Sequence, residues 1–412
     1  MTLLLIQLFI AMQLFAIFSN DLGCIDLLVY RAGGRAVLAG NDLYVPDFPP
    51  INDAPNLPFT YPPFAALLFV PLALLPLATA KAIALVLNAV ACAVLFSVVV
   101  VASRNAWQRL HSRRELFAPV STKVRVVVFA AAIFFLLSEP VQATFRFGQI
   151  NLVLAAAVAV DVLLPHARWP RGLLVGLAVA VKLTPVVFVA YFVITRQWRA
   201  AVVSSATALS VTLIGWILLP ADTFRYFSSL LDLQARVGDL ESASNQSVWG
   251  VVLRSVSPDS MRVPLWAAAT VLVLALAVVA IAVSYRRGDR AAAMLAAAIA
   301  GLLCSPVSWG HHWVWLSAAA TYFLVRWVGT GGMRDLIIGV VVAAVTVIAP
   351  WTFLPDYSEP ERLWNPLQHM GQSTWAVAAA LILVVFAASA FGARPTTSQS
   401  PSIRSRGRSY PS

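Results

Sequence analysis

Long apolar segments, separated by short basic stretches, are the feature that most constrains this chain. Residues 77–102 contain one charged side chain, Lys81, and a helix needs about 20 apolar residues to cross the hydrocarbon layer of a membrane. The apolar segments do not alternate with period two, as the strands of a membrane barrel do. Helices are the other structure that satisfies its own backbone in lipid. The sequence therefore predicts an all-α, polytopic membrane protein.

Composition supports the same class. Hydrophobic residues make up 60% of the 412 residues and charged residues 11%, whereas about 25% of a soluble domain is charged. We count about 12 transmembrane helices, with residues 3–18 as an uncleaved anchor and first span. Residues 1–392 are expected to form a single membrane-embedded domain. Residues 393–412 are basic and rich in Ser and Pro, which predicts a disordered cytoplasmic tail.

Charge is distributed unevenly between the loops. Three long polar loops, residues 21–63, 220–262 and 351–372, hold five, five and three of the 18 acidic residues. Basic residues gather in short stretches such as 285–290 and in the tail. By the positive-inside rule, the three loops lie outside a plasma membrane and the tail lies inside. This rule also explains the net charge of +11, and without a soluble basic domain we expect no nucleic-acid partner.

One part of the topology allows two readings. If residues 64–76 form a full span, the basic stretch 103–125 lies outside. If they form an interfacial or re-entrant helix, that stretch lies inside, which the charge rule favours. In that case Leu173–Ile194 forms a hairpin broken near Lys182, and Gln149 and Lys182 come to the outer face.

The first loop contains the strongest candidate for a catalytic residue, Asp26. Residues 27–39 are expected to form a short interfacial helix that Gly40 ends. Asp26 then lies at the helix N-terminus, where the backbone N–H groups favour an ionised carboxylate. Such a carboxylate suits a general base toward a sugar hydroxyl, and the alternative is that Asp26 only caps the helix. The aromatic strip Asn56–Pro63, which includes Tyr61, either forms a wall of a lipid or sugar site or belongs to an interfacial aromatic belt.

Polar residues from distant segments are candidates for binding. Lys182 lies in an apolar run, and a lipid phosphate is a fitting partner for it; the alternative is that it reaches the interface. The adjacent His311 and His312 are candidates to donate to a phosphate, with neighbouring tryptophans stacked on sugar or belonging to an aromatic belt. Residues Glu139, Gln149 and Asn151 flank a helix break, where they would either bind a head group or cap helices.

Cofactor motifs are not recognisable in the sequence. The three cysteines, Cys24, Cys92 and Cys304, lie far apart, so neither a metal spacing nor a disulfide framework follows. The sequence contains no P-loop and no dinucleotide fingerprint. We therefore expect no metal and no organic cofactor.

Several short motifs occur together in one order. They are D-x-x-V-Y-R-A-G (Asp26–Gly33), G-x-D-L-Y (Gly40–Tyr44), N-L-P-F-T-Y-P-P (Asn56–Pro63), F-G-Q-I-N (Phe147–Asn151), K-L-T-P (Lys182–Pro185) and S-P-V-S-W-G-H-H-W-V-W (Ser305–Trp315). With them the chain resembles the polyprenol-phosphate-mannose-dependent α-(1→2)-mannosyltransferases of glycosyltransferase family 87, above all those that act on phosphatidylinositol mannosides. The resemblance covers nearly the whole chain.

The resemblance implies a GT-C type architecture with long extracytoplasmic loops. It also implies transfer of mannose from polyprenyl-phosphate-mannose to a hydroxyl of a phosphatidylinositol mannoside, with inversion, on the extracytoplasmic face. The catalytic aspartate of the family falls on Asp26. The expected donor phosphate-binding residues are Lys182, His311 and His312, and the expected donor- or acceptor-binding residues are Arg31, Tyr61, Gln149, Asn151 and Trp309.

The chemistry of these residues agrees with the implied reaction. An inverting transfer needs one base on the acceptor hydroxyl and does not need the two carboxylates of a glycosidase. Its partners would be the lipid-linked donor, the glycolipid acceptor and membrane lipids. Three other functions remain open: a sister enzyme that branches lipomannan or lipoarabinomannan, a transporter of anionic lipids, and a structural partner in the cell envelope. The transporter predicts internal repeats, and none is visible here.

Overall fold

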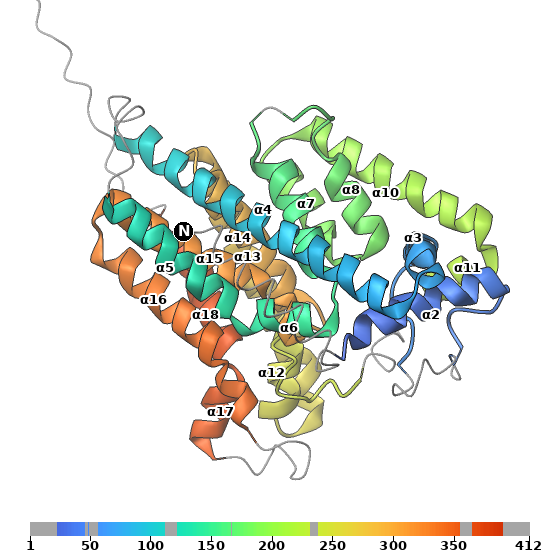
Figure 1. Ribbon diagram of the computed structural model, residues 1–412. Coiled ribbons are helices and arrows are strands. Elements are labelled where there is room, and N and C mark those ends of the chain that lie inside the picture. Colours follow the sequence, from blue (N-terminus) through green and yellow to red (C-terminus); the bar gives the residue numbers. More distant parts are fainter. Residues whose placement is uncertain are drawn as a thin grey trace, which may run out of the picture.

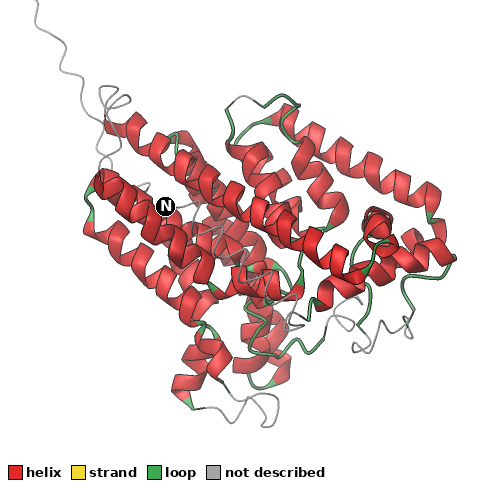
Figure 2. Ribbon diagram, viewed as in Figure 1, coloured by secondary structure: helices red, strands yellow, loops and turns green. Residues whose placement is uncertain are grey.

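The chain folds as a bundle of helices, which confirms the all-α class. The computed structural model describes residues 23–45, 48, 57–111, 122–165, 167–230, 238–354 and 365–389, and within these ranges there are helices and no strands (Figures 1 and 2). The α-helices are α2 (Ile25–Ala39), α3 (Pro63–Leu74), α4 (Leu77–His111), α5 (Thr122–Leu137), α6 (Glu139–Phe147), α7 (Asn151–Leu163), α8 (Leu173–Val181), α9 (Val187–Ile194), α10 (Trp198–Leu218), α11 (Pro220–Ser228), α12 (Val248–Ser255), α13 (Arg262–Arg286), α14 (Arg290–Cys304), α15 (Val314–Thr330), α16 (Met333–Ile348), α17 (Pro366–Gln372) and α18 (Thr374–Ala388). Short 3₁₀ turns include η2 (Thr184–Val186), η4 (Asp259–Met261), η5 (Gly310–His312) and η6 (Pro350–Phe353).

The helices pack in two groups that α4 joins. In one group α15 lies among α4, α5, α14 and α16, and α13 and α18 pack beside α14; in the other, α7, α8 and α10 lie beside α2 and α3 (Figure 1). Helix α4 contacts both α15 and α7. Most residues of α14 and α15 are buried, so these two helices form the centre of the bundle.

Four of the described helical segments are long and apolar enough to cross a membrane: Leu77–Arg104, Trp198–Leu218, Asp259–Arg286 and Met333–Phe353. The number is up to six if the bent pairs α5–α6 and α17–α18 each count as one span. The chain is therefore a membrane protein by the length and composition of its helices. The first expected span, residues 3–18, and the tail, residues 393–412, lie outside the described residues. The count of about 12 stays a prediction.

Two adjacent glycines allow α2 to approach α3 and the segment before it closely. A Cβ atom on Gly33 would lie 2.5 Å from the ring of Phe59, and one on Gly34 would lie 2.9 Å from the carbonyl oxygen of Phe69. Real Cβ atoms do not come so close to neighbouring atoms, and interiors are packed without spare room. Close packing thus explains Gly33, the last residue of the first motif, and Gly34, which follows it.

A buried aspartate shapes the turn between α7 and α8. The carboxylate of Asp161 accepts hydrogen bonds from the backbone N–H groups of Gly172 and Val175, at 3.0 Å each. These bonds satisfy N–H groups at the start of α8 that have no partner within the helix. The turn therefore fixes how α7 and α8 lie beside each other. It brings Asn151, at the start of α7, and Lys182, after the end of α8, to the same end of the bundle.

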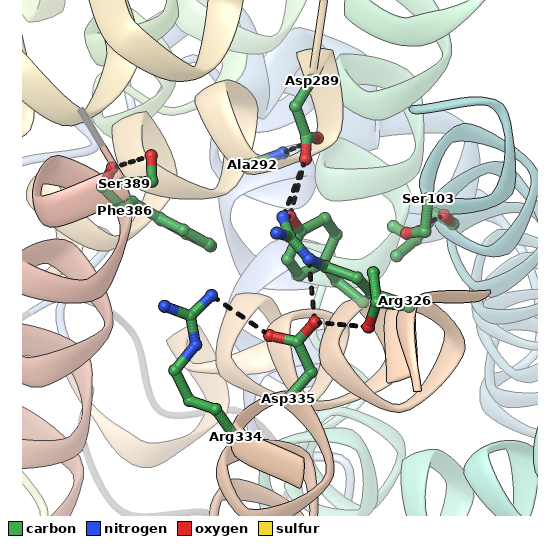
Figure 3. Close-up of polar contacts among 11 residues, drawn as sticks. Ser103, Asp289, Ala292, Arg326, Arg334, Asp335, Phe386 and Ser389 are labelled. Carbon is green, nitrogen blue, oxygen red and sulfur yellow. Dashed lines mark hydrogen bonds and ion pairs between the residues drawn. The ribbon is translucent and has the colours of Figure 1, made fainter. Parts of the chain in front are cut away.

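A polar cluster joins α14, α15 and α16 at the other end of the bundle (Figure 3). Arg326 donates to Asp335 at 2.9 Å and to the hydroxyl of Tyr322 at 2.7 Å, and it lies 3.4 Å from Asp289. Tyr322 in turn donates to Asp289 at 2.7 Å, and Arg334 lies 3.5 Å from Asp335. Helices α14 and α15 each run from this cluster to the loop that holds His311 and His312, over roughly 22–25 Å.

Candidate active site

Asp26 occupies the second position of α2. The residue that caps this helix is Cys24, whose φ of 48° is left-handed, and among the described residues no side chain makes a capping bond there. The interpretation of Asp26 as a mere helix cap is therefore wrong, whereas the expected helix and its end at Gly40 are confirmed. The N–H of Cys24 donates to the carbonyl of Arg146 at 3.0 Å, so the start of α2 is tied to the end of α6.

Gln149 connects Asp26 to three aromatic side chains. It follows Gly148, which ends α6 with a φ of 66°. The carbonyl oxygen of the Gln149 side chain accepts hydrogen bonds from Tyr30 at 2.9 Å and from Tyr61 at 3.2 Å. This fixes the orientation of the amide, so its nitrogen faces Nε2 of His311 at 3.3 Å and also donates to Asp26.

Lys182 lies where the predicted hairpin is broken, and the break is confirmed. Its backbone is extended, with φ −150° and ψ 128°, between α8 and η2. The ammonium group donates to the side-chain oxygen of Asn151 at 2.9 Å and to Nε2 of His312 at 3.2 Å, and it lies 5.2 Å from the centre of the Tyr61 ring. Because an ammonium group has three N–H donors, one donor is left for a ligand.

His311 and His312 are neutral in this arrangement. Burial, helped by the charge of Lys182, holds the pKa of each imidazole well below its usual value. In both rings Nε2 receives a hydrogen bond, from the Gln149 amide and the Lys182 ammonium respectively, so the remaining proton is on Nδ1. Neither ring supplies a positive charge, and each keeps one N–H donor.

Asp26 has the properties of a base that works near neutral pH. Burial raises the pKa of its carboxyl group to about 6, and the hydrogen bond from Gln149 and the charge of Lys182 partly oppose this effect. A general base is most effective when its pKa lies near the working pH. Asp26 is ionised at pH 7 and still basic enough to accept a proton.

Two cavities open on this cluster from different sides. One, of about 70 Å³, has Asn151, Lys182 and His312 in its wall together with the apolar rings of Phe188 and Trp315. The second is a cleft of about 820 Å³. Its lining includes Glu139, Phe147, Trp309, His311 and Trp351.

The structure brings together most of the predicted site residues. One network of contacts joins seven of them: Asp26, Tyr61, Gln149, Asn151, Lys182, His311 and His312. Trp309 lines the larger cleft. Arg31 lies elsewhere: its guanidinium donates to the carbonyl groups of Leu72 and Leu75 at the end of α3.

The sequence analysis did not identify two residues of the site, Tyr30 and Trp351. Tyr30 follows Asp26 by four positions, a spacing that places two side chains on the same helix face, so its role could have been found. Trp351 lies in η6 and reaches the cleft from the other end of the chain. No local signal in the sequence marks it.

Comparisons with known proteins point to one family. The family model described as glycosyltransferase family 87 matches residues 59–306, which is more than half of the chain. A protein of Mycobacterium tuberculosis named polyprenol-phosphate-mannose-dependent α-(1-2)-phosphatidylinositol mannoside mannosyltransferase is 36% identical over 87% of this chain and 84% of its own length. A protein of the same name from Mycolicibacterium smegmatis is 34% identical over 87% of this chain and 83% of its own length.

The name of a further relative states a related acceptor, a pentamannoside. It is a polyprenol-phosphate-mannose-dependent α-(1-2)-phosphatidylinositol pentamannoside mannosyltransferase of Mycolicibacterium smegmatis, 33% identical over 89% of this chain and 83% of its own length. No solved structure matches the chain. From the match of the family model and the similarity of these relatives along most of the sequence, the chain belongs to glycosyltransferase family 87.

Proposed function

We propose that this protein transfers mannose from polyprenyl-phosphate-mannose to a hydroxyl of a phosphatidylinositol mannoside and forms an α-(1→2) linkage with inversion. The names of the relatives supply the donor and the acceptor class. The observation that carries the proposal is the convergence of one carboxylate, Asp26, and one ammonium group, Lys182, from distant parts of the chain on one network of hydrogen bonds. An inverting glycosyl transfer needs a base on one reactant and stabilisation of the leaving group on the other.

The wall of the smaller cavity offers polar partners for the phosphate group of a lipid-linked donor. Its polar wall is formed by Asn151, Lys182 and His312, and its apolar wall by rings such as Phe188 and Trp315. A phosphate oxygen would accept the third N–H of Lys182, and the isoprenoid chain would continue along the apolar side. As the bond between C1 of mannose and the phosphate oxygen breaks, the negative charge on the phosphate grows, and Lys182 stabilises it.

Asp26 acts on the acceptor in this proposal. The carboxylate takes the proton of the acceptor hydroxyl while the oxygen attacks C1 of mannose from the side opposite to the leaving phosphate. One O–H bond and one C1–O bond break, one C1–O bond and one carboxyl O–H bond form, and polyprenyl phosphate leaves. Gln149, held by Tyr30 and Tyr61, keeps the carboxylate in place before it reacts.

The site lies on the extracytoplasmic face of the plasma membrane in this proposal, within a GT-C type architecture of about 12 helices. Three basic residues, Arg286, Arg287 and Arg290, lie where α13 ends and α14 begins, and the loop with His311 and His312 follows the other end of α14. Because basic residues remain in the cytoplasm, this loop then lies on the extracytoplasmic side. Arg171 likewise lies in the turn before α8, at the opposite end of this helix from Lys182. Its position supports the same orientation, with Lys182 on the extracytoplasmic side.

A transfer assay tests the function. Membranes or nanodiscs containing the protein would receive radiolabelled polyprenyl-phosphate-mannose and, in separate reactions, a phosphatidylinositol mannoside with few mannoses, a pentamannoside, or lipomannan. We expect labelled product that an α-(1→2)-specific mannosidase cleaves. If lipomannan alone accepts label, the sister enzyme is the correct assignment. Movement of lipid between leaflets without transfer to any acceptor would instead support the transporter and overturn the proposal.

A further inference from the structure

The larger cleft beside His311 contains polar atoms that the network around Asp26 does not use. One oxygen of the Glu139 carboxyl group is buried and has no hydrogen-bond partner within the described part of the chain. The other oxygen lies 3.4 Å from Arg146, which is a long contact for an ion pair. The indole N–H of Trp351, in the same lining, is likewise buried and without a partner among the described residues. Buried polar groups normally have partners, so an acceptor and a donor here are available to a ligand.

Gly310 lies directly against both side chains. A Cβ atom at this position would lie 2.8 Å from the ring of Trp351 and 3.1 Å from the free oxygen of Glu139. Any larger residue would therefore push both groups away. Gly310 directly precedes His311 in η5, so the free polar atoms lie beside the residue that contacts Gln149.

The charges of the cleft favour an uncharged, hydroxyl-rich ligand. Glu139, Asp239 and Arg146 all line it, so it lacks the uniformly positive surface that a phosphate requires. Its aromatic members, Phe147, Trp309 and Trp351, offer flat apolar faces, and each tryptophan also carries a polar N–H. A carboxyl oxygen and an indole N–H beside such faces match a sugar ring, which presents hydroxyl donors and acceptors around an apolar C–H face.

We propose that this cleft binds a mannose ring of the acceptor, with Glu139 accepting a hydrogen bond from a sugar hydroxyl and the indole of Trp351 donating one. This inference rests on the proposed function and adds to it the residues that select the acceptor. The cleft volume of about 820 Å³ lies within the range of roughly 300–1,000 Å³ found for small-molecule sites. His311 would separate this acceptor from the donor phosphate next to His312.

Two variants with matched controls test the inference. Glu139→Gln replaces the free carboxyl oxygen with an amide while keeping the shape, and Trp351→Phe removes the indole N–H. We expect each to raise the KM for the acceptor about tenfold, the factor for one lost hydrogen bond, and to leave kcat and the donor KM within about twofold. Asp259→Asn, at an exposed carboxylate, and Trp266→Phe, at another indole without a partner among the described residues, should change none of these values.

Direct binding separates failure of the inference from failure of the proposed function. Saturation-transfer NMR with methyl α-mannoside in nanodiscs reports occupancy of the cleft whether or not transfer occurs. We expect a signal in the wild type that weakens in Glu139→Gln and Trp351→Phe and persists in both controls. Unchanged acceptor KM and unchanged mannoside signal in the two variants would overturn the inference. A wild type that binds mannoside but transfers no mannose would overturn only the proposed function.

Discussion

The rings of His311 and His312 lie at 85° to each other, with centroids 4.5 Å apart, and they face different cavities. His311 borders the large cleft and contacts Gln149, while His312 borders the small cavity and contacts Lys182. Two neighbouring residues thus mark the boundary between the proposed acceptor and donor sides. Asp26 reaches this boundary through Gln149.

Replacement of Asp26 should abolish transfer. Asp26→Asn keeps the size of the side chain but removes its basicity, so we expect kcat to fall by about 10²–10⁴-fold, the range for loss of a general base. Donor affinity and the melting temperature should stay close to those of the wild type. Transfer by Asp26→Asn at a near-normal rate would show that another group takes the proton. Asp42→Asn, an exposed carboxylate paired with Arg225, serves as the control.

Transfer should depend on pH with an acid limb set by Asp26. Its carboxyl pKa is raised to about 6, and the base is active only when deprotonated. Asp26 is therefore mostly deprotonated at pH 7, and the rate falls about tenfold per pH unit below pH 6. Measurement of kcat/KM between pH 4.5 and 8 checks this. An acid limb centred near pH 4, the ordinary value for an aspartate, would contradict the role of burial at this site.

Lys182→Ala should weaken donor binding. The substitution removes an ammonium group that contacts Asn151 and His312 and that would bind the phosphate. A hydrogen bond to a charged group contributes about 1.5–3 kcal/mol, so we expect the donor KM to rise about 10–100-fold with little change in acceptor KM. Lys123→Ala, at the far end of α5, is the matched control. Equal donor affinity in the wild type and in Lys182→Ala would assign Lys182 a purely structural role.

Gly34→Ala should destabilise the protein because the added methyl group would meet the backbone of α3. Its Cβ would lie 2.9 Å from the carbonyl oxygen of Phe69, and relief of such overpacking costs about 1–3 kcal/mol. A lower melting temperature in detergent would confirm it. Gly23→Ala, where a Cβ meets nothing within 4 Å, should leave the melting temperature unchanged. Equal melting temperatures for both variants would refute the close approach of α2 and α3.

Arg326→Met should be more damaging than Arg334→Met. Loss of Arg326 leaves Asp289 and Asp335 buried without their shared cation (Figure 3), and breaking a buried pair costs about 3–5 kcal/mol. Arg334 is exposed and contacts Asp335 at 3.5 Å, so its loss should cost at most about 1 kcal/mol. Thermal unfolding of the two variants in the same detergent makes the comparison. Similar losses would mean that the cluster does not hold α14, α15 and α16 together.

Local features of the fold were predictable from the sequence. Gly40 ends α2 as expected, because a glycine can adopt the left-handed conformation at a helix end. The break at Lys182 was predictable because a proline, Pro185, follows closely in an otherwise apolar run. Asp26, Lys182 and the histidines were found because polar residues stand out in an apolar chain.

The lateral arrangement of the helices was not predictable. On α10, Leu209 and Ile217 are exposed whereas Val211 and Gly215 are buried. All four are apolar or small, because lipid is as apolar as the protein interior and gives helices no polar side to read. For the same reason Glu139 could be marked only as a residue beside a helix break, and its meeting with Trp351 needs the folded chain.

Arg31 has a consequence for the position of the first loop in the membrane. A helix that ends within hydrocarbon leaves carbonyl groups without donors, which costs several kcal/mol for each group. Arg31, itself buried, donates to the carbonyls of Leu72 and Leu75, and its charge is favourable at the negative end of the helix dipole. Helix α3, only about 18 Å long, can therefore stop short of either aqueous phase. Arg31 thus supplies the solvation that water would otherwise give to the end of α3, so α2 and α3 need not follow the level of the lipid head groups.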